Sequence, residues 1–234
     1  MKTAILIDGG FFLKRYHCIR GFERQDSPEL VAKNLVSYCF KHIYRVNQYR
    51  KRYDLPPTEL YRIYYYDSKP FDGDSRGPIS KRAISFKNTD QYKFRNKLFE
   101  ALKQQRKIAL RLGFLKNSSK EWSIRSKYTK KLLSGQIKIS ELKQDDLEYP
   151  LQQKAVDMKL GLDIATLAFK DLVSQIILIA GDSDFVPAAK FARREGVDFI
   201  LDPMLNPIDP TLHEHIDGKM TIKNMAKQED NASQ

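Results

Sequence analysis

Apolar residues along this chain follow two alternating periodicities. Short runs rich in β-branched and aromatic residues predict strands, and longer stretches with apolar residues three and four positions apart predict helices. The predicted strands are Ala4–Ile7, Leu60–Tyr66, Ile108–Leu115, Ile176–Ala180 and Val197–Leu201. The predicted helices are Pro28–Arg50, Asp90–Lys107, Gln152–Lys170 and Ala188–Arg194.

This alternation indicates βαβ units around a parallel sheet, with right-handed crossovers that place helices on both faces. The pattern weakens from Lys116 to Tyr149, where short apolar pieces at 122–124 and 137–139 suggest an excursion from the sheet, such as a small hairpin lobe. A loop is predicted at Phe71–Gly77. We expect one domain over residues 1–218, with the lobe at about 116–150, and a fraying polar tail at 219–234.

Composition is that of an ordered domain, because 41% of the 234 residues are hydrophobic. No apolar run is long enough to cross a bilayer or to form a signal-peptide core. Cys18 and Cys39 suggest neither a disulfide framework nor a zinc site. A cytoplasmic protein without a membrane partner is therefore expected. The oligomeric state is left open, with a homo-oligomer among the alternatives.

The positive charge of the chain lies in one central segment. Residues 81–143 hold 18 of the 41 Lys and Arg but 4 of the 29 Asp and Glu, whereas the remainder, with 23 basic and 25 acidic residues, is nearly balanced. A concentrated cationic surface favours a polyanion through counterion release, which indicates RNA or another nucleic acid as partner. The alternative is a solvated, lysine-rich surface.

Three aspartates follow predicted strands. Asp8 comes after the first strand, and Asp182 and Asp184 come after the fourth, with Asp157 near the start of a helix. If the first and fourth strands are neighbours, these carboxylates share the crevice at a topological switch point. Individually, each has a simpler explanation as a helix cap, a turn residue or a charge favoured by the helix dipole.

Together, the four aspartates predict a metal site. Carboxylates with water suit Mg²⁺ or Mn²⁺, and no Cys or His of the kind that zinc prefers lies nearby in the sequence. Such an ion can polarise a phosphoryl oxygen and lower the pKa of bound water. With the basic segment, this predicts hydrolysis of a nucleic-acid phosphodiester by in-line attack of water. Asp163 lies about 240° around the helix from Asp157, so a salt bridge is its expected role.

Other residues are candidates for contacts with the substrate. Lys154 and Lys159 flank Asp157 and are expected either to contact phosphate or to neutralise the acidic cluster. Trp122, near Arg125 and Lys127, is expected either to stack on a base or to form the core of the small lobe. The remaining candidates are Ser183, beside the strand-end acids, and Asp67, as a supporting acid or a turn residue.

At these residues the chain resembles the NYN domain family, the LabA-like members of the PIN-like nuclease superfamily. The matching motifs are Ile7-Asp-Gly-Gly10, Tyr65-Tyr-Asp67, the stretch from Lys154 to Asp163, and Gly181-Asp-Ser-Asp-Phe-Val-Pro187. The resemblance implies a three-layer αβα, PIN-like (Rossmann-like) fold with a mainly parallel central sheet. The charge and apolar patterns add a basic insertion between the third and fourth strands. It also implies metal-dependent ribonuclease activity at Asp8, Asp157, Asp182 and Asp184. Many relatives carry Asn where this chain has Gly10.

Two other functions compete with the nuclease. One is a non-catalytic RNA-binding or assembly module that retains an acidic, metal-stabilised pocket. The other is a small-molecule phosphohydrolase, which predicts a nucleophilic Asp-x-Asp after the first strand, where this chain has Asp8-Gly-Gly. No glycine-rich nucleotide-binding loop is present in the sequence, which argues against an NTPase.

Overall fold

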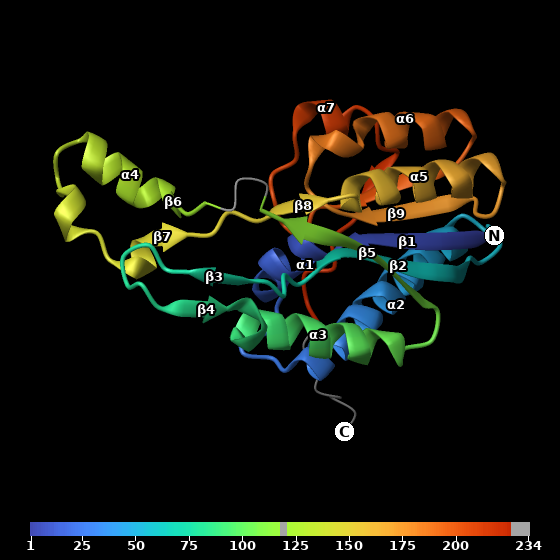
Figure 1. Ribbon diagram of the computed structural model, residues 1–234. Helices are drawn as coiled ribbons and strands as arrows, with labels where there is room; N and C mark the ends of the chain where they lie inside the picture. The colour runs from blue at the N-terminus through green and yellow to red at the C-terminus, as the bar shows by residue number, and fades with distance from the viewer. Residues whose placement is uncertain (118–120, 226–234) are drawn as a thin grey trace, which may run out of the picture.

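The computed structural model describes residues 1–117 and 121–225, which form a mixed α/β fold around a seven-stranded sheet (Figure 1). The strand order is β11-β10-β9-β1-β2-β5-β8, and every neighbouring pair is parallel except β5 and β8. The strands are β1 (Lys2–Asp8), β2 (Glu59–Lys69), β5 (Ile108–Lys116), β8 (Gln152–Lys154), β9 (Gln175–Ile179), β10 (Asp198–Asp202) and β11 (Gly218–Lys219).

The strand order reverses direction between β1 and β9. From β1 the chain adds β2 and β5 on one side, and β9 and β10 extend the sheet on the other. Ile7 of β1 is opposite Ile179 of β9. The predicted adjacency of the first and fourth strands is therefore confirmed, and it creates the topological switch point where open α/β sheets bind ligands.

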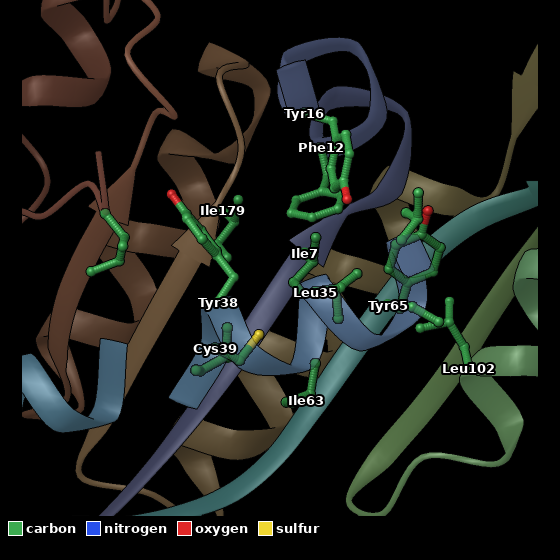
Figure 2. Close-up of a cluster of buried hydrophobic side chains, with 14 of the residues drawn as sticks. Ile7, Phe12, Tyr16, Leu35, Tyr38, Cys39, Ile63, Tyr65, Leu102 and Ile179 are labelled. Atoms are coloured by element: carbon green, nitrogen blue, oxygen red, sulfur yellow. The ribbon is translucent and has the colours of Figure 1, made fainter. Parts of the chain in front are cut away.

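Helices cover both faces of the sheet, which makes three layers (Figure 1). They are α1 (Gly9–Arg15), α2 (Pro28–Arg52) and α3 (Asp90–Lys103) on one face, and α5 (Val156–Phe169) and α6 (Val186–Arg194) on the other, with the short α7 (Pro210–His213) beside α6. Successive β1 side chains point to opposite faces. Ile5 and Ile7 enter the core under α2, shown in Figure 2, while Ala4 and Leu6 enter the core under α5.

Local sequence signals set the helix boundaries. Ser27 caps α2, accepting a hydrogen bond from the Leu30 N–H, and Pro28 fits its first turn. Thr89 caps α3 in the same way. This helix ends at Lys103, earlier than predicted, and Lys107 takes a left-handed conformation with φ of 65°.

The prediction of a helix starting at Gln152 is wrong. Gln152–Lys154 instead forms β8, the antiparallel edge strand paired with β5. Ala155 then adopts φ of 67°, a left-handed conformation, and α5 begins only at Val156. The physical reason lies in the pattern itself, because the apolar helical spacing starts at Val156 and the preceding polar residues carry no helical signal.

A smaller unit projects beyond the C-terminal edge of β5 (Figure 1). It contains the antiparallel pair β6 (Ser123–Ile124) and β7 (Leu147–Glu148) and the helix α4 (Ser126–Leu133), which sequence did not predict. Beside it, β3 (Asp74–Arg76) and β4 (Ala83–Ser85) form a hairpin, so the region predicted as a loop holds a strand. The apolar piece at 137–139 is not a strand and leads into the 3₁₀ helix η3 (Ile139–Glu141). We refer to residues 121–150 as the small lobe.

The polar tail begins later than predicted. Ile222 is buried, and Asn224 forms a β-bridge with Arg20, so residues 219–225 pack against the domain. The rest of the predicted tail, residues 226–234, lies outside the described residues. Over the described part of the chain, no helix combines the length and the apolar character that crossing a membrane requires.

Candidate active site

The strands β1 and β9 lead into acidic residues at the same edge of the sheet. Asp8 ends β1 and caps α1, its Oδ1 accepting a 3.1 Å hydrogen bond from the Phe11 N–H. Asp182 follows β9, and its Oδ1 accepts a 3.1 Å hydrogen bond from the Asp184 N–H. The capping roles considered from sequence therefore occur. They do not exclude a chemical role, because an ionised carboxylate has about four acceptor sites.

Asp8 and Asp182 line one open cleft of about 490 Å³. Gly181 allows the Phe11 ring to pack closely against the backbone of the cleft wall, because a Cβ atom at residue 181 would lie 2.4 Å from that ring. The other lining residues are Gly10, Phe11, Lys14, Arg15, Gly181, Ser183, Asn206 and Asp209. The cleft thus holds three carboxylates, those of Asp8, Asp182 and Asp209, with two basic side chains beside them.

Four of the cleft residues were not predicted. Lys14 and Arg15 reach the cleft from α1, a seven-residue helix that gave no periodic signal of its own. Six and seven residues after Asp8, they could have been found only by expecting a helix directly after that strand. Asn206 and Asp209 come from the loop after β10, and no sequence motif indicates them.

Burial and neighbouring charges disfavour the ionised form of Asp8. Burial in the protein raises the pKa of Asp8 to about 6, and the charges of Asp157 and Asp67 add to this increase, while the hydrogen bond from the Phe11 N–H opposes it. Asp8 therefore lies within electrostatic range of acids from both β2 and α5.

Asp157 and Asp184 do not line this cleft but lie near it. Asp157 is in the first turn of α5, and partial desolvation together with the charges of Asp182 and Asp184 raises its pKa. Asp184 lies in the 3₁₀ helix η5 (Ser183–Phe185) and is exposed. The fold therefore brings the four predicted aspartates into one electronegative region.

This acidic region lacks a compensating cation bonded to it. Among the described residues, none of these four aspartates takes part in an ion pair with Lys, Arg or His. Within the same residues, no three acidic, histidine or cysteine side chains converge closely enough to form a complete metal site. The charge is thus concentrated, but the carboxylates do not enclose an ion on their own.

Two further acids form ion pairs with arginines. Asp163 accepts hydrogen bonds of 2.8 Å from Arg111 Nε and from the Tyr66 hydroxyl, so its predicted salt bridge is confirmed. Asp67 is not at the end of its strand, because β2 continues to Lys69. It is buried and pairs with Arg95, and it adjoins the acidic region through its effect on Asp8.

The predicted substrate-binding residues fall into two places. Ser183 lines the cleft. Lys154 is exposed on β8, and Lys159 Nζ donates a 2.7 Å hydrogen bond to the Leu112 carbonyl in the middle of β5. Neither lysine forms an ion pair with an acid of the cluster within the described chain.

The other predicted substrate contacts lie in the small lobe. Trp122 is half-buried, donates from Nε1 to Ser75 Oγ at 3.0 Å, and lies 5.4 Å from the ring of Tyr149. These are contacts of a lobe core, the second of its two expected roles. Arg125 and Lys127 are exposed, and Lys127 packs on the ring of Tyr128.

Comparison with known proteins identifies one family by sequence. The sequence model of the NYN domain matches residues 78–206. These residues include Asp157, Asp182 and Asp184, and exclude Asp8. A crystal structure of a protein of unknown function from Vibrio parahaemolyticus is similar at 16% identity, covering 94% of this chain and 92% of the other, with a TM-score of 0.39. None of the curated proteins matches.

A doubly covered parallel sheet with acids at its switch point, together with this match, defines a protein of the PIN-like nuclease superfamily. The matched residues make up more than half of the chain, which therefore belongs to the NYN domain family.

Proposed function

We propose that this protein is a metal-dependent ribonuclease that hydrolyses internal phosphodiester bonds of RNA. The observation that carries this proposal is the common cleft of Asp8 and Asp182, with Lys14 and Arg15 in the same wall. Carboxylates are suited to holding a hard cation, and the two basic side chains are suited to the phosphate that approaches them. We place the catalytic unit in one NYN domain that includes residues 1–218 and the packed segment 219–225, with the small lobe as its insertion.

The side chains present fit Mg²⁺ or Mn²⁺ by their chemistry. All four candidate ligands, Asp8, Asp157, Asp182 and Asp184, offer carboxylate oxygen, and Mg²⁺ commonly binds through one or two carboxylates plus water and substrate phosphate. An incomplete protein cage is therefore compatible with such an ion. When bound, the ion supplies charge stabilisation at the phosphoryl group and acidifies water.

The remaining steps belong to the protein's own groups. Lys14 and Arg15 hold the phosphate against the cleft wall and offset its charge. The carboxylate of Asp8 is one of the oxygen donors that would hold the ion, and the Phe11 N–H fixes one of its two oxygens and so sets its orientation in the cleft.

RNA binding is assigned to the small lobe. Lys127, Lys130 and Lys131 lie on α4, and none of them forms an ion pair within the described residues. The helix contains no acidic residue, so its charge is available to phosphates. Arg125, which was also predicted to contact RNA, is the residue that precedes this helix.

The second candidate is a non-catalytic RNA-binding module. The absence of three converging ligands among the described residues favours it, because an inactive relative can keep an acidic pocket without a bound ion. Both candidates predict RNA binding, and only the first predicts cleavage.

Cleavage by a matched pair of variants separates the two candidates. Wild type is expected to cut a labelled single-stranded RNA with Mn²⁺ or Mg²⁺ and to stop when EDTA is added. Asp182→Asn should lower the rate at least about 100-fold, because the cleft loses a charged ligand, while RNA affinity in EDTA and the circular dichroism spectrum stay unchanged. Asp54→Asn, the same change on the exposed residue that follows α2, serves as control. Equal cleavage rates for Asp182→Asn and wild type would contradict the nuclease proposal.

A further inference from the structure

A second cavity lies beside the acidic cleft, between the ends of β2 and β5 and the start of α3. Its volume is about 130 Å³. Sites for whole small molecules usually measure about 300–1,000 Å³. This cavity therefore has room for one ring system and none for a complete nucleotide.

Aromatic rings form part of its wall. Phe71, Phe86 and Tyr92 line it, and the rings of Phe71 and Phe86 meet edge to face with centroids 5.2 Å apart. The Tyr149 ring of the small lobe packs on the Phe86 ring with centroids 5.2 Å apart, and the Trp122 ring lies 5.4 Å from that of Tyr149. The rings are thus fixed before any ligand arrives, which lowers the entropy lost on binding.

The rest of the wall is polar but nearly neutral. Asp67 is only 2% exposed, Ser68 is 4% exposed, and the carboxylate of Asp67 is paired with Arg95. The side-chain amides of Gln91 and Gln153 complete the rim with both donors and acceptors. A phosphate would find no unpaired cation here, and an aliphatic chain would leave the polar groups without partners. A flat heteroaromatic ring with donors and acceptors on its edge satisfies both parts of the wall.

The cavity is next to the proposed reaction site. Tyr66 of β2 is the register partner of Asp8 of β1, and Asp67 follows directly. Adjacent strands lie about 4.8 Å apart. A base that neighbours a phosphate at Asp8 therefore lies near Asp67, which lines the cavity.

We infer that this cavity binds one unpaired nucleobase of the RNA, next to the phosphate that is cleaved. The inference rests on the proposed function for its substrate class, and it adds that cleavage requires an unpaired base at a fixed position from the cut. The rings stack on the base, and the glutamine amides and Arg95 contact its edge.

Binding without cleavage tests this inference separately. Affinity is measured in EDTA by fluorescence anisotropy with a 12-nucleotide single-stranded RNA and with an abasic oligomer of the same length. Phe86→Ala should weaken RNA binding about 5- to 150-fold, the range for loss of one stacking partner, and leave the abasic oligomer unaffected. Gln153→Ala, an exposed change on β8, should shift the preference among poly(A), poly(C) and poly(U) without loss of fold. Tyr44→Ala, an exposed aromatic on α2 away from the cavity, is the matched control.

Each outcome decides the inference. Unchanged RNA affinity in both cavity variants overturns it, and so does an equal loss for RNA and the abasic oligomer, because that loss would not depend on a base. If wild type fails to cleave RNA but Phe86→Ala still weakens base-dependent binding, the result supports a nucleobase site in the cavity and contradicts the nuclease proposal. If wild type cleaves RNA and the cavity variants cut at the same positions with the same affinity, the nuclease proposal is supported and the nucleobase site is contradicted.

Discussion

Ile7 and Ile179 are register partners on β1 and β9, and this pairing places Asp8 and Asp182 in the same cleft. The two isoleucines are 172 residues apart in the chain. Because the strands are parallel, the residues that follow them leave at the same edge of the sheet. The candidate site therefore depends on strand register as much as on the aspartates themselves, and a slip of one residue would turn Asp8 to the other face.

Gly9 should be intolerant of any side chain. A Cβ atom at this position would lie 2.5 Å from Tyr65 Cζ and 2.7 Å from the Tyr66 carbonyl oxygen. Gly9→Ala is expected to reduce the free energy of unfolding by about 1–3 kcal/mol, because the buried ring and backbone have to move. Urea unfolding measures this loss.

Gly10→Ala is the matched control for that change. The nearest atom to a Cβ at Gly10 is Asp8 Oδ1 at 3.4 Å, an ordinary contact. Its stability should equal that of wild type within about 0.5 kcal/mol. If both variants lose the same stability, steric exclusion at Gly9 is not the cause.

Asp8 should make stability depend on pH. Its pKa in the folded protein is about 6 against 3.8 as the ordinary value, so the folded state binds the proton more tightly than the unfolded state. Stability from this group is complete below pH 3.8 and is lost as the pH rises through 6. Asp8→Asn removes the charge, and without metal it should be more stable than wild type at pH 8 by up to about 3 kcal/mol.

Urea unfolding in EDTA at pH 8 and near pH 4 measures this difference, which should shrink at the lower pH. Asp209→Asn is the control, because hydrogen bonds from Thr211 lower the pKa of Asp209 and give it the opposite pH dependence. No gain in stability for Asp8→Asn at pH 8 would show that the carboxylate of Asp8 is not disfavoured by its surroundings.

Asp163 should matter for stability and not for cleavage. Its carboxylate holds Arg111 and the Tyr66 hydroxyl together across α5, β5 and β2. Asp163→Ala is expected to cost about 1–3 kcal/mol in unfolding, because two donors lose a charged acceptor. The cleavage rate and its metal dependence, measured below the unfolding transition, should remain those of wild type. A loss of metal-dependent cleavage comparable to that of Asp182→Asn would instead make Asp163 part of the metal site.

The basic face of α4 should control the salt dependence of RNA binding. Changing Lys127, Lys130 and Lys131 together to Gln removes three potential phosphate contacts from an exposed helix. The slope of log affinity against log salt should fall by up to about 2, since each contact with single-stranded RNA contributes about 0.7. Anisotropy titrations at several salt concentrations measure it. An unchanged slope would show that these lysines of the small lobe do not contact RNA phosphates.

The sequence predicted the sheet strands best where burial is complete. The run at 176–180 is apolar throughout and became β9, whose five residues are all buried. Prediction failed where tertiary pairing decided the structure. Gln152–Lys154 is polar and exposed, and it is a strand only because β5 offers it a free edge. The helix α1 is too short for its periodicity to be recognised.

By itself, the sequence determined the five central strands β1, β2, β5, β9 and β10, the excess of positive charge in one segment and the four aspartates at or near strand and helix ends. The tertiary structure alone decided that Lys14 and Arg15 share a cleft with Asp8, that Trp122 packs in the small lobe, and that a ring-sized cavity adjoins the acids. The physical reason is the distance along the chain between the residues that interact. Burial patterns and caps depend on neighbours along the chain, whereas a cleft depends on which distant strands become partners in the sheet.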